Sequence, residues 1–107
     1  MGRIEETFAR LKSKNEKALI TYIMAGDPDL DTTGSLIEAI ERTGADILEL
    51  GVPFSDPVAD GPTIQRASDR ALKSKTTLKK VMALVKKIRR KVTVPIIVMT
   101  YYNIIFQ

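Results

Sequence analysis

The chain has 107 residues, of which 44% are hydrophobic and 28% charged, a composition typical of a globular domain that excludes a disordered or fibrous protein. It contains no cysteine and no histidine, which excludes disulfides, thiol nucleophiles and thiolate metal sites and leaves acid–base chemistry to carboxylates, lysine or tyrosine. The formal net charge of +4 suits an anionic substrate or simple solubility and does not distinguish the two.

We expect neither a membrane span nor a signal peptide. The longest apolar runs, such as Ile96 to Met99, are far too short to cross a bilayer, and residues 1–10 mix charged with apolar side chains. A chain without cysteine can also fold in a reducing compartment, so we expect a cytoplasmic protein.

The first two predicted elements are a short helix and a strand. Ile4, Phe8 and Leu11 recur at helical spacing among charged residues, which predicts an amphipathic helix over residues 3–12. Residues 18–24 are mostly apolar without a clean polar alternation, the pattern of a strand that is covered on both faces.

A second helix follows the first strand. Residues 26–28 break that strand, and the helix after them carries Leu36, Ile37 and Ile40 on its apolar face. Gly44 ends this helix, as a glycine just beyond the last turn commonly does. The candidate caps of its first turn are Asp29, Asp31 and Thr32.

Residues 46–51 form the next predicted strand, and the connections are short enough to require a right-handed parallel crossover. Residues 53–62 hold three prolines and a glycine, so we expect a loop there.

Two further helices and a strand complete the predicted elements. The helices cover residues 63–73 and 76–91, the second capped by Thr76, and Pro95 opens a strand over residues 96–100. The expected inward-facing residues are Ile64, Ala67, Ala71 and Leu72 in the first helix and Leu78, Val81, Met82, Val85 and Ile88 in the second.

Strands that alternate with helices indicate an α/β fold with parallel strands, either a barrel or a doubly wound sheet. An open third strand would leave a sheet edge exposed, which invites self-association, strand exchange or disorder. The sequence closes on residues 104–107, an apolar ending just past a buried strand, whereas natural termini are usually polar, so we expect a chain cut from a longer one.

Two carboxylates near the second strand are the candidate chemical groups. Glu49 shares a strand face with Ile47 and Gly51, where burial would favour the protonated form and suit general acid or base work. Asp60 precedes the predicted start of a helix, whose dipole favours the ionised form. Such a pair is a recognised acid–base pattern. The residues alone leave open that Glu49 faces outward in a salt bridge and that Asp60 only orders a turn.

The run ELGVPFSDPVADGPT over residues 49–63 closely resembles the signature of the tryptophan synthase alpha subunit family. The resemblance continues at AGDP (residues 25–28), at TIQ (residues 63–65) and at MTYYN (residues 99–103), with Phe106 nearby, and it covers the whole chain.

The resemblance implies a TIM-type (β/α)₈ barrel, of which this chain supplies the first three β/α units plus an N-terminal helix. Residues 1–107 would then be the N-terminal part of a single barrel domain. The family is a lyase of tryptophan biosynthesis that needs no cofactor of its own. It cleaves indole-3-glycerol phosphate to indole and glyceraldehyde 3-phosphate by a retro-aldol step.

The resemblance also implies roles for individual residues. Glu49 would be the acid–base group, and Asp60 would assist at the indole nitrogen. The implied substrate-binding residues are Tyr22, Ile64, Met99 and Tyr101, each of which also fits plain core packing. The residues that match positions where the family meets its beta subunit are Pro53, Asp56, Pro57 and Asn103.

The family's phosphate site follows strands seven and eight, which these 107 residues do not include. The activity is therefore expected to be incomplete in this chain. The alternative is a non-catalytic barrel fragment that acts only through assembly, by binding the beta subunit or by self-association through the open sheet edge.

Two weaker patterns are set aside. Asp27, Asp29, Asp31 and Glu38 match calcium-loop positions, but Thr32 replaces the required glycine, so we expect no metal. The helix over residues 76–91 is strongly basic, but no aromatic residues interleave its charges for base stacking. We therefore expect the solvated face of a barrel helix, with neither nucleic acid nor a membrane as partner.

Overall fold

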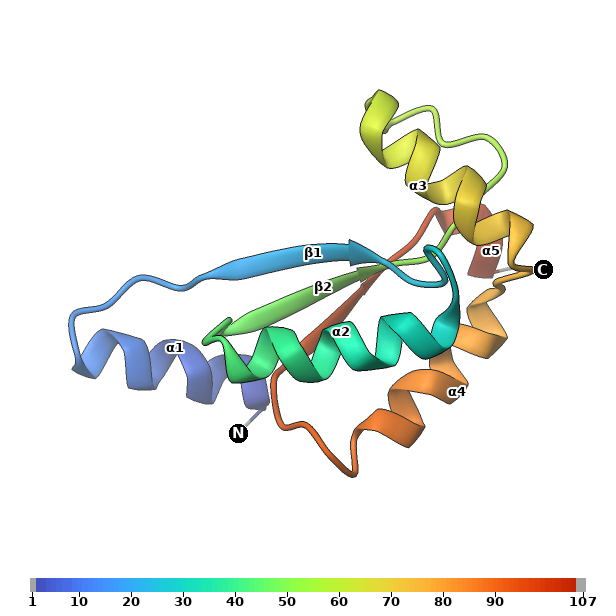
Figure 1. The fold of residues 1–107 in the computed structure, drawn as a ribbon. Helices are drawn as coiled ribbons and strands as arrows, with labels where there is room; N and C mark the ends of the chain where they lie inside the picture. The colour runs from blue at the N-terminus through green and yellow to red at the C-terminus, as the bar shows by residue number, and fades with distance from the viewer. Residues whose placement is uncertain (1, 106–107) are drawn as a thin grey trace.

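The computed structural model describes residues 2–105 (Figure 1). Phe106, which belongs to the family resemblance, lies outside the described residues, as does Gln107. Three strands form one parallel sheet in the order β1-β2-β3. Their bounds are Ile20–Met24 for β1, Ile47–Gly51 for β2 and Ile96–Met99 for β3. The predicted α/β class with parallel strands is therefore confirmed.

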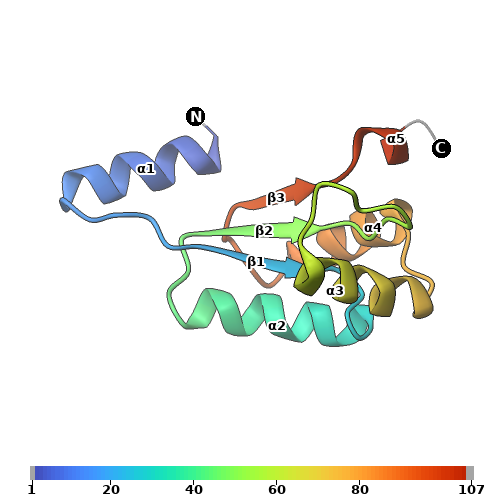
Figure 2. The same cartoon turned by 90° about the horizontal axis from the view of Figure 1, so that it is seen from above.

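Five helices connect or flank these strands within the described residues. They are α1 (Arg3–Ser13), α2 (Leu30–Arg42), α3 (Pro62–Lys73), α4 (Leu78–Ile88) and the short α5 (Tyr102–Ile105). Figures 1 and 2 show α2 and α4 together on one face of the sheet and α3 on the opposite side, near the C-terminal ends of the strands. The helix α1 lies at the N-terminal ends of the strands.

The core lies between the sheet and the pair of helices α2 and α4. Leu48 and Leu50 of β2 are fully buried there, and they pack in one cluster with Ile37 of α2 and Val81 and Ile88 of α4. Apolar side chains at every second position of a strand point to the same face, which explains why β2 presents this pair to the helices.

The opposite face of the sheet is only partly covered. Ile20, Tyr22 and Met99 are all exposed to solvent, so the expectation that β1 is covered on both faces is wrong. The reason is geometric, because α3 packs on this face against Met24, at the C-terminal end of β1, and leaves Ile20 and Tyr22 uncovered.

Most predicted helix ends agree with the structure, and one cap does not. Asp29 caps α2, its Oδ1 accepting a hydrogen bond of 2.7 Å from the Thr32 backbone N–H. Gly44 follows the helix with a φ of +101°, as a terminating glycine should. The predicted cap Thr76 is wrong, since α4 starts two residues later and the Thr77 hydroxyl accepts from the Lys80 backbone N–H at 3.2 Å.

Thr76 is instead buried against the loop that follows β1. Its hydroxyl lies 3.1 Å from that of Ser74, and a Cβ built on Gly26 would lie 1.8 Å from it. Gly26 also has a φ of +86°, a backbone conformation that favours glycine. Position 26 therefore requires glycine for two reasons, the backbone conformation and the lack of room for a Cβ beside Thr76.

Four apolar residues expected to face inward are exposed, namely Ile4 and Phe8 in α1, Leu36 in α2 and Met82 in α4. The helix α1 buries Leu11 and Thr7 instead, because it lies against the strand ends rather than along the sheet. No helix within residues 2–105 is long and apolar enough to cross a membrane.

Candidate functional site

The C-terminal edge of the sheet holds a cavity of about 510 Å³. Parallel strands bring their carboxyl ends to one edge, so side chains from β1, from the loop after β2, from α3 and from the end of β3 meet there. The lining residues are Tyr22, Met24, Val52, Phe54, Ala59, Asp60, Ile64, Ser68, Met99, Thr100 and Tyr101. Five of them are predicted site residues, namely Tyr22, Asp60, Ile64, Met99 and Tyr101.

Asp60 is half-buried at this cavity and is held by a tyrosine from beyond β3. The Tyr101 hydroxyl donates a hydrogen bond of 3.2 Å to Asp60 Oδ2 and accepts one of 2.9 Å from the backbone N–H of Ala59. The Tyr101 ring also stacks on Phe54, with centroids 5.1 Å apart. These contacts tie both ends of the loop after β2 to one aromatic side chain.

Two side chains of α3 fix the same loop from the other side. The buried Ser68 hydroxyl accepts a hydrogen bond from the Phe54 backbone N–H and donates one to the Phe54 carbonyl, both at 2.9 Å. Gln65 Nε2 donates to the Asp60 carbonyl at 2.8 Å and to the Pro57 carbonyl at 3.4 Å. The backbone of Asp60 is therefore positioned independently of its carboxylate.

Sequence reasoning assigned no role to Ser68, Phe54 or Gln65 in the site. For Ser68 a usable signal existed, because this polar residue follows Ile64 by one helical turn and so shares the apolar face of α3. Nothing local in the sequence indicates its two partners, which lie fourteen residues away.

Glu49 lies on the open face of the sheet, with Tyr22 of β1 and Ile97 of β3 as its register neighbours. It is half-buried, forms no ion pair within residues 2–105, and is not one of the residues that line the cavity. The salt bridge of the alternative interpretation is thus not formed among the described residues. The carboxylate is close enough to influence Tyr22 electrostatically.

Tyr22 bridges the positions of the two carboxylates. Its hydroxyl lies over Gly51, where a Cβ would stand only 2.0 Å from the phenolic oxygen. Partial burial raises the pKa of Tyr22 above its ordinary value, and the negative charges of Asp60 and Glu49 and the phenol of Tyr101 raise it further. The Tyr22 hydroxyl therefore stays protonated and available as a donor.

The predicted partner-contact residues differ in exposure. Asp56 and Asn103 are exposed and Pro57 is partly exposed, whereas Pro53 is buried at the start of the loop. Within residues 2–105, no group of three or more acidic, histidine or cysteine residues is arranged to hold a metal ion. Asp27 instead receives two hydrogen bonds from Arg70, at 2.8 and 3.0 Å.

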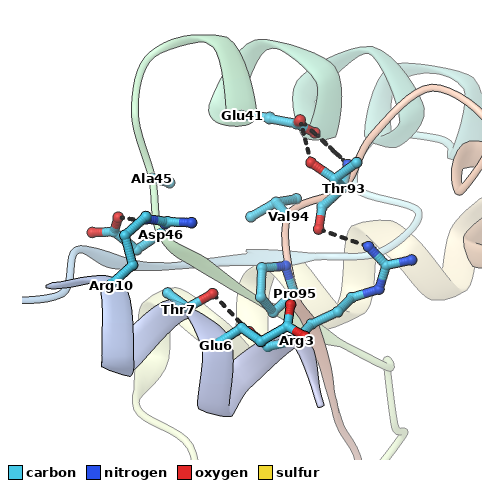
Figure 3. Close-up of a pocket in the computed structure, with 10 residues that line it drawn as sticks. All are labelled: Arg3, Glu6, Thr7, Arg10, Glu41, Ala45, Asp46, Thr93, Val94 and Pro95. Carbon is cyan, nitrogen blue, oxygen red and sulfur yellow. Dashed lines mark hydrogen bonds and ion pairs between the residues drawn. The ribbon is translucent and has the colours of Figure 1, made fainter. Parts of the chain in front are cut away.

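A second cavity, of about 310 Å³, lies where α1 meets the loops before β2 and β3 (Figure 3). Its polar groups are largely engaged with one another. Arg3 donates to the Thr93 carbonyl at 3.2 Å, the Thr93 N–H and hydroxyl donate to Glu41, and Arg10 approaches Asp46 at 4.0 Å. These contacts attach α1 to the N-terminal ends of the strands. A structural role is therefore enough to account for the polar residues of this cavity.

The first cavity suits a flat apolar ligand with one N–H donor. Met24, Ile64 and Met99 provide apolar walls, and the Asp60 carboxylate provides an acceptor at the edge. None of the lining residues is lysine or arginine, so this cavity by itself offers no cationic side chain to an anionic group.

Comparison with known proteins identifies close relatives. The family model described as "Tryptophan synthase alpha chain" matches residues 8–107. The tryptophan synthase alpha chain of Geotalea daltonii is 63% identical over 106 residues, which cover 99% of this chain and 40% of that protein. That of Geotalea uraniireducens is 59% identical over 106 residues, with the same coverage. The chain spans about 40% of the length of the curated relatives it matches.

Solved structures of the same family also superpose closely on this chain. Tryptophan synthase subunit alpha from Legionella pneumophila superposes with a TM-score of 0.96 at 45% identity, over 100% of this chain and 41% of that one. Tryptophan synthase from M. tuberculosis in an aminoacrylate-bound form gives a TM-score of 0.91 at 36% identity, over 99% and 43%. The present fold is that of the N-terminal part of a TIM-type (β/α)₈ barrel.

Proposed function

Since the chain belongs to the tryptophan synthase alpha chain family, we propose that it supplies the indole-binding and acid–base part of a lyase site. The reaction is cleavage of indole-3-glycerol phosphate to indole and glyceraldehyde 3-phosphate, a step of tryptophan biosynthesis. Residues 1–107 then form part of one barrel domain, without a cofactor of its own and located in the cytoplasm.

The observation that carries the proposal is the placement of Asp60 at the edge of an apolar cavity. The carboxylate is held by the Tyr101 hydroxyl at 3.2 Å, and Ile64 and Met99 belong to the lining of the same cavity. An indole ring between such walls would present its N–H to Asp60, which stabilises the positive charge that develops on the ring nitrogen when the ring is protonated.

Glu49 is the proposed proton shuttle. The reaction breaks the bond between carbon 3 of the indole and the first carbon of its side chain. Carbon 3 gains a proton, and the hydroxyl on the first side-chain carbon loses one as it becomes the aldehyde. One carboxyl group beside the cavity can take the hydroxyl proton and return it to carbon 3, so no net proton is consumed. Half-burial beside Tyr22 supports this role for Glu49.

The phosphate group of the substrate needs residues from elsewhere. The cavity lining has no lysine or arginine, and the chain spans about 40% of the length of its relatives. We therefore expect this chain to contribute the ring-binding and proton-transfer groups but only weak anchoring of the phosphate.

The experiment that tests the proposal is the release of indole from indole-3-glycerol phosphate by the chain, with and without added beta subunit. Glu49→Gln keeps the size of the side chain but cannot shuttle a proton, so release should be lost. Glu16→Gln is the matched control, because Glu16 is exposed and does not line the cavity. Equal release by the chain and by Glu49→Gln would contradict the proposal.

A second function is favoured by the apolar residues exposed around the same edge. Val58 in the loop after β2 and Tyr102 and Ile105 in α5 are exposed, as are Asp56 and Asn103. These residues suit contact with a beta subunit, and the uncovered face with Ile20 and Met99 suits self-association. Analytical sedimentation with and without the beta subunit distinguishes the two, and a monomer that binds no beta subunit would contradict both.

A further inference from the structure

The cavity contains four hydroxyl groups, on Tyr22, Ser68, Thr100 and Tyr101, and three of them are already used. Ser68 donates to the Phe54 carbonyl, Thr100 donates to the Tyr101 carbonyl at 3.2 Å, and Tyr101 donates to Asp60. The Tyr22 hydroxyl makes no hydrogen bond within residues 2–105. It is the one cavity hydroxyl that still has a donor to offer among the residues described.

The position of this hydroxyl depends on a glycine in the neighbouring strand. The Tyr22 phenol lies across Gly51, and a Cβ at that residue would stand 2.0 Å from the phenolic oxygen and 2.7 Å from the ring carbon that bears it. No other residue type at position 51 leaves room for the ring in this place. The phenol is therefore placed between the strand that carries Glu49 and the cavity that holds Asp60.

An O–H donor and a carboxylate select different atoms of a ligand. Asp60 can only accept a hydrogen bond when ionised, so it matches the N–H of an indole ring. The Tyr22 hydroxyl has no acceptor for its hydrogen among residues 2–105, so it matches a ligand oxygen that accepts a hydrogen bond. A substituent on carbon 3 of an indole, directed from the ring toward Glu49, would bring such an oxygen to this side of the cavity.

We propose that the Tyr22 hydroxyl is a specificity-determining donor, which binds an oxygen on the side chain of an indole ligand while the ring contacts the apolar walls. This inference rests on the proposed function, because it assumes that the cavity takes an indole. A ligand with an alkyl side chain would bury the donor without a partner, and an unpaired buried donor is penalised. The cavity should therefore discriminate by one oxygen atom rather than by size.

The test uses two ligands that differ by that oxygen, indole-3-ethanol and 3-ethylindole. The chain contains no tryptophan, so indole fluorescence excited beyond the tyrosine band reports binding without a protein background. We expect the chain to bind the alcohol more tightly by on the order of tenfold, the effect of one such hydrogen bond. Tyr22→Phe keeps the ring and removes the donor, so the preference should fall to about one.

Tyr102→Phe is the matched control, because it removes a phenolic hydroxyl from a residue that does not line the cavity. This variant should keep the preference for the alcohol. Circular dichroism of each variant verifies that the fold is retained. A preference for the alcohol that survives in Tyr22→Phe would overturn the inference and leave the proposed function standing. Failure of the unaltered chain to bind either ligand would overturn both.

Discussion

The hydroxyl of Tyr101 is hydrogen-bonded to Asp60 Oδ2 at 3.2 Å, across a separation of 41 residues in the chain. The same oxygen accepts from the Ala59 N–H at 2.9 Å. A single phenol therefore fixes both the carboxylate and the adjacent backbone of the loop after β2. The geometry of this loop depends on the third strand, because Tyr101 lies two residues beyond the end of β3.

Replacing Tyr101 by phenylalanine tests this connection. The ring can still stack on Phe54, but the hydrogen bonds to Asp60 and Ala59 are lost. We expect the free energy of unfolding to fall by about 1 kcal/mol, the typical net effect of a hydrogen bond, and indole binding to weaken. Urea unfolding and indole fluorescence measure the two effects. Unchanged values in both would show that the loop is held without this phenol.

Ser68→Ala should be more costly than an ordinary serine substitution in a helix. It leaves the backbone N–H and carbonyl of Phe54 without their partner in a buried place. We expect a loss of about 1–3 kcal/mol in the free energy of unfolding. Ser35→Ala, on the exposed face of α2, is the matched control and should be neutral or slightly stabilising. Similar values for the two variants would contradict the buried role of Ser68.

Gly51→Ala should displace the Tyr22 phenol, because the added methyl group would lie 2.0 Å from its oxygen. Because Tyr22 is partly exposed and its ring can move, we expect a destabilisation of only about 0.5–1.5 kcal/mol, the cost of a side chain held off its preferred rotamer, together with loss of the preference for indole-3-ethanol. Thermal or urea unfolding and the paired fluorescence titrations measure these effects.

The matched control for Gly51→Ala is a glycine with room for a methyl group. At Gly34 in α2 the nearest atom to an added Cβ is Leu84 Cδ1 at 3.5 Å, an ordinary contact. Gly34→Ala should therefore stabilise the chain by about 0.5–1 kcal/mol, since alanine favours a helix interior. A comparable loss of stability in Gly34→Ala and Gly51→Ala would mean that the contact with Tyr22 is not the cause of the destabilisation at position 51.

The cap of α2 should give the stability a dependence on pH in acid. The hydrogen bonds that Asp29 accepts from Thr32 hold the pKa of Asp29 below its usual value of 3.8 in the folded chain. A depressed folded pKa means that the contribution of Asp29 is present above its unfolded pKa and is lost as the pH falls through the folded pKa. Asp29→Asn can cap without a titrating charge, so it should flatten this part of the pH profile. Urea unfolding at a series of acidic pH values measures the effect. The same dependence of the free energy of unfolding on pH in Asp29→Asn and in the unaltered chain would contradict this account.

Part of the site was predictable from the residues. Asp60 was a candidate from the residues themselves, and Tyr22, Ile64, Met99 and Tyr101 were implied by the family resemblance; the structure places all five around one cavity. Their roles in binding or catalysis remain predictions. The spacing from Ile64 indicated that Ser68 faces inward, but its partners were not predictable, because a serine in an amphipathic helix gives no indication of which distant backbone group it will contact.

The sequence by itself determined the elements of this protein, because their signals are local. Asp29 caps α2 within three residues, Gly44 ends it, and helical spacing marks the residues of α4 that reach the core. The tertiary structure alone decided which face of the sheet is covered, that Thr76 is buried against Gly26 rather than capping α4, and that Tyr101 reaches Asp60. These outcomes depend on contacts between segments tens of residues apart, whose energies no local pattern encodes.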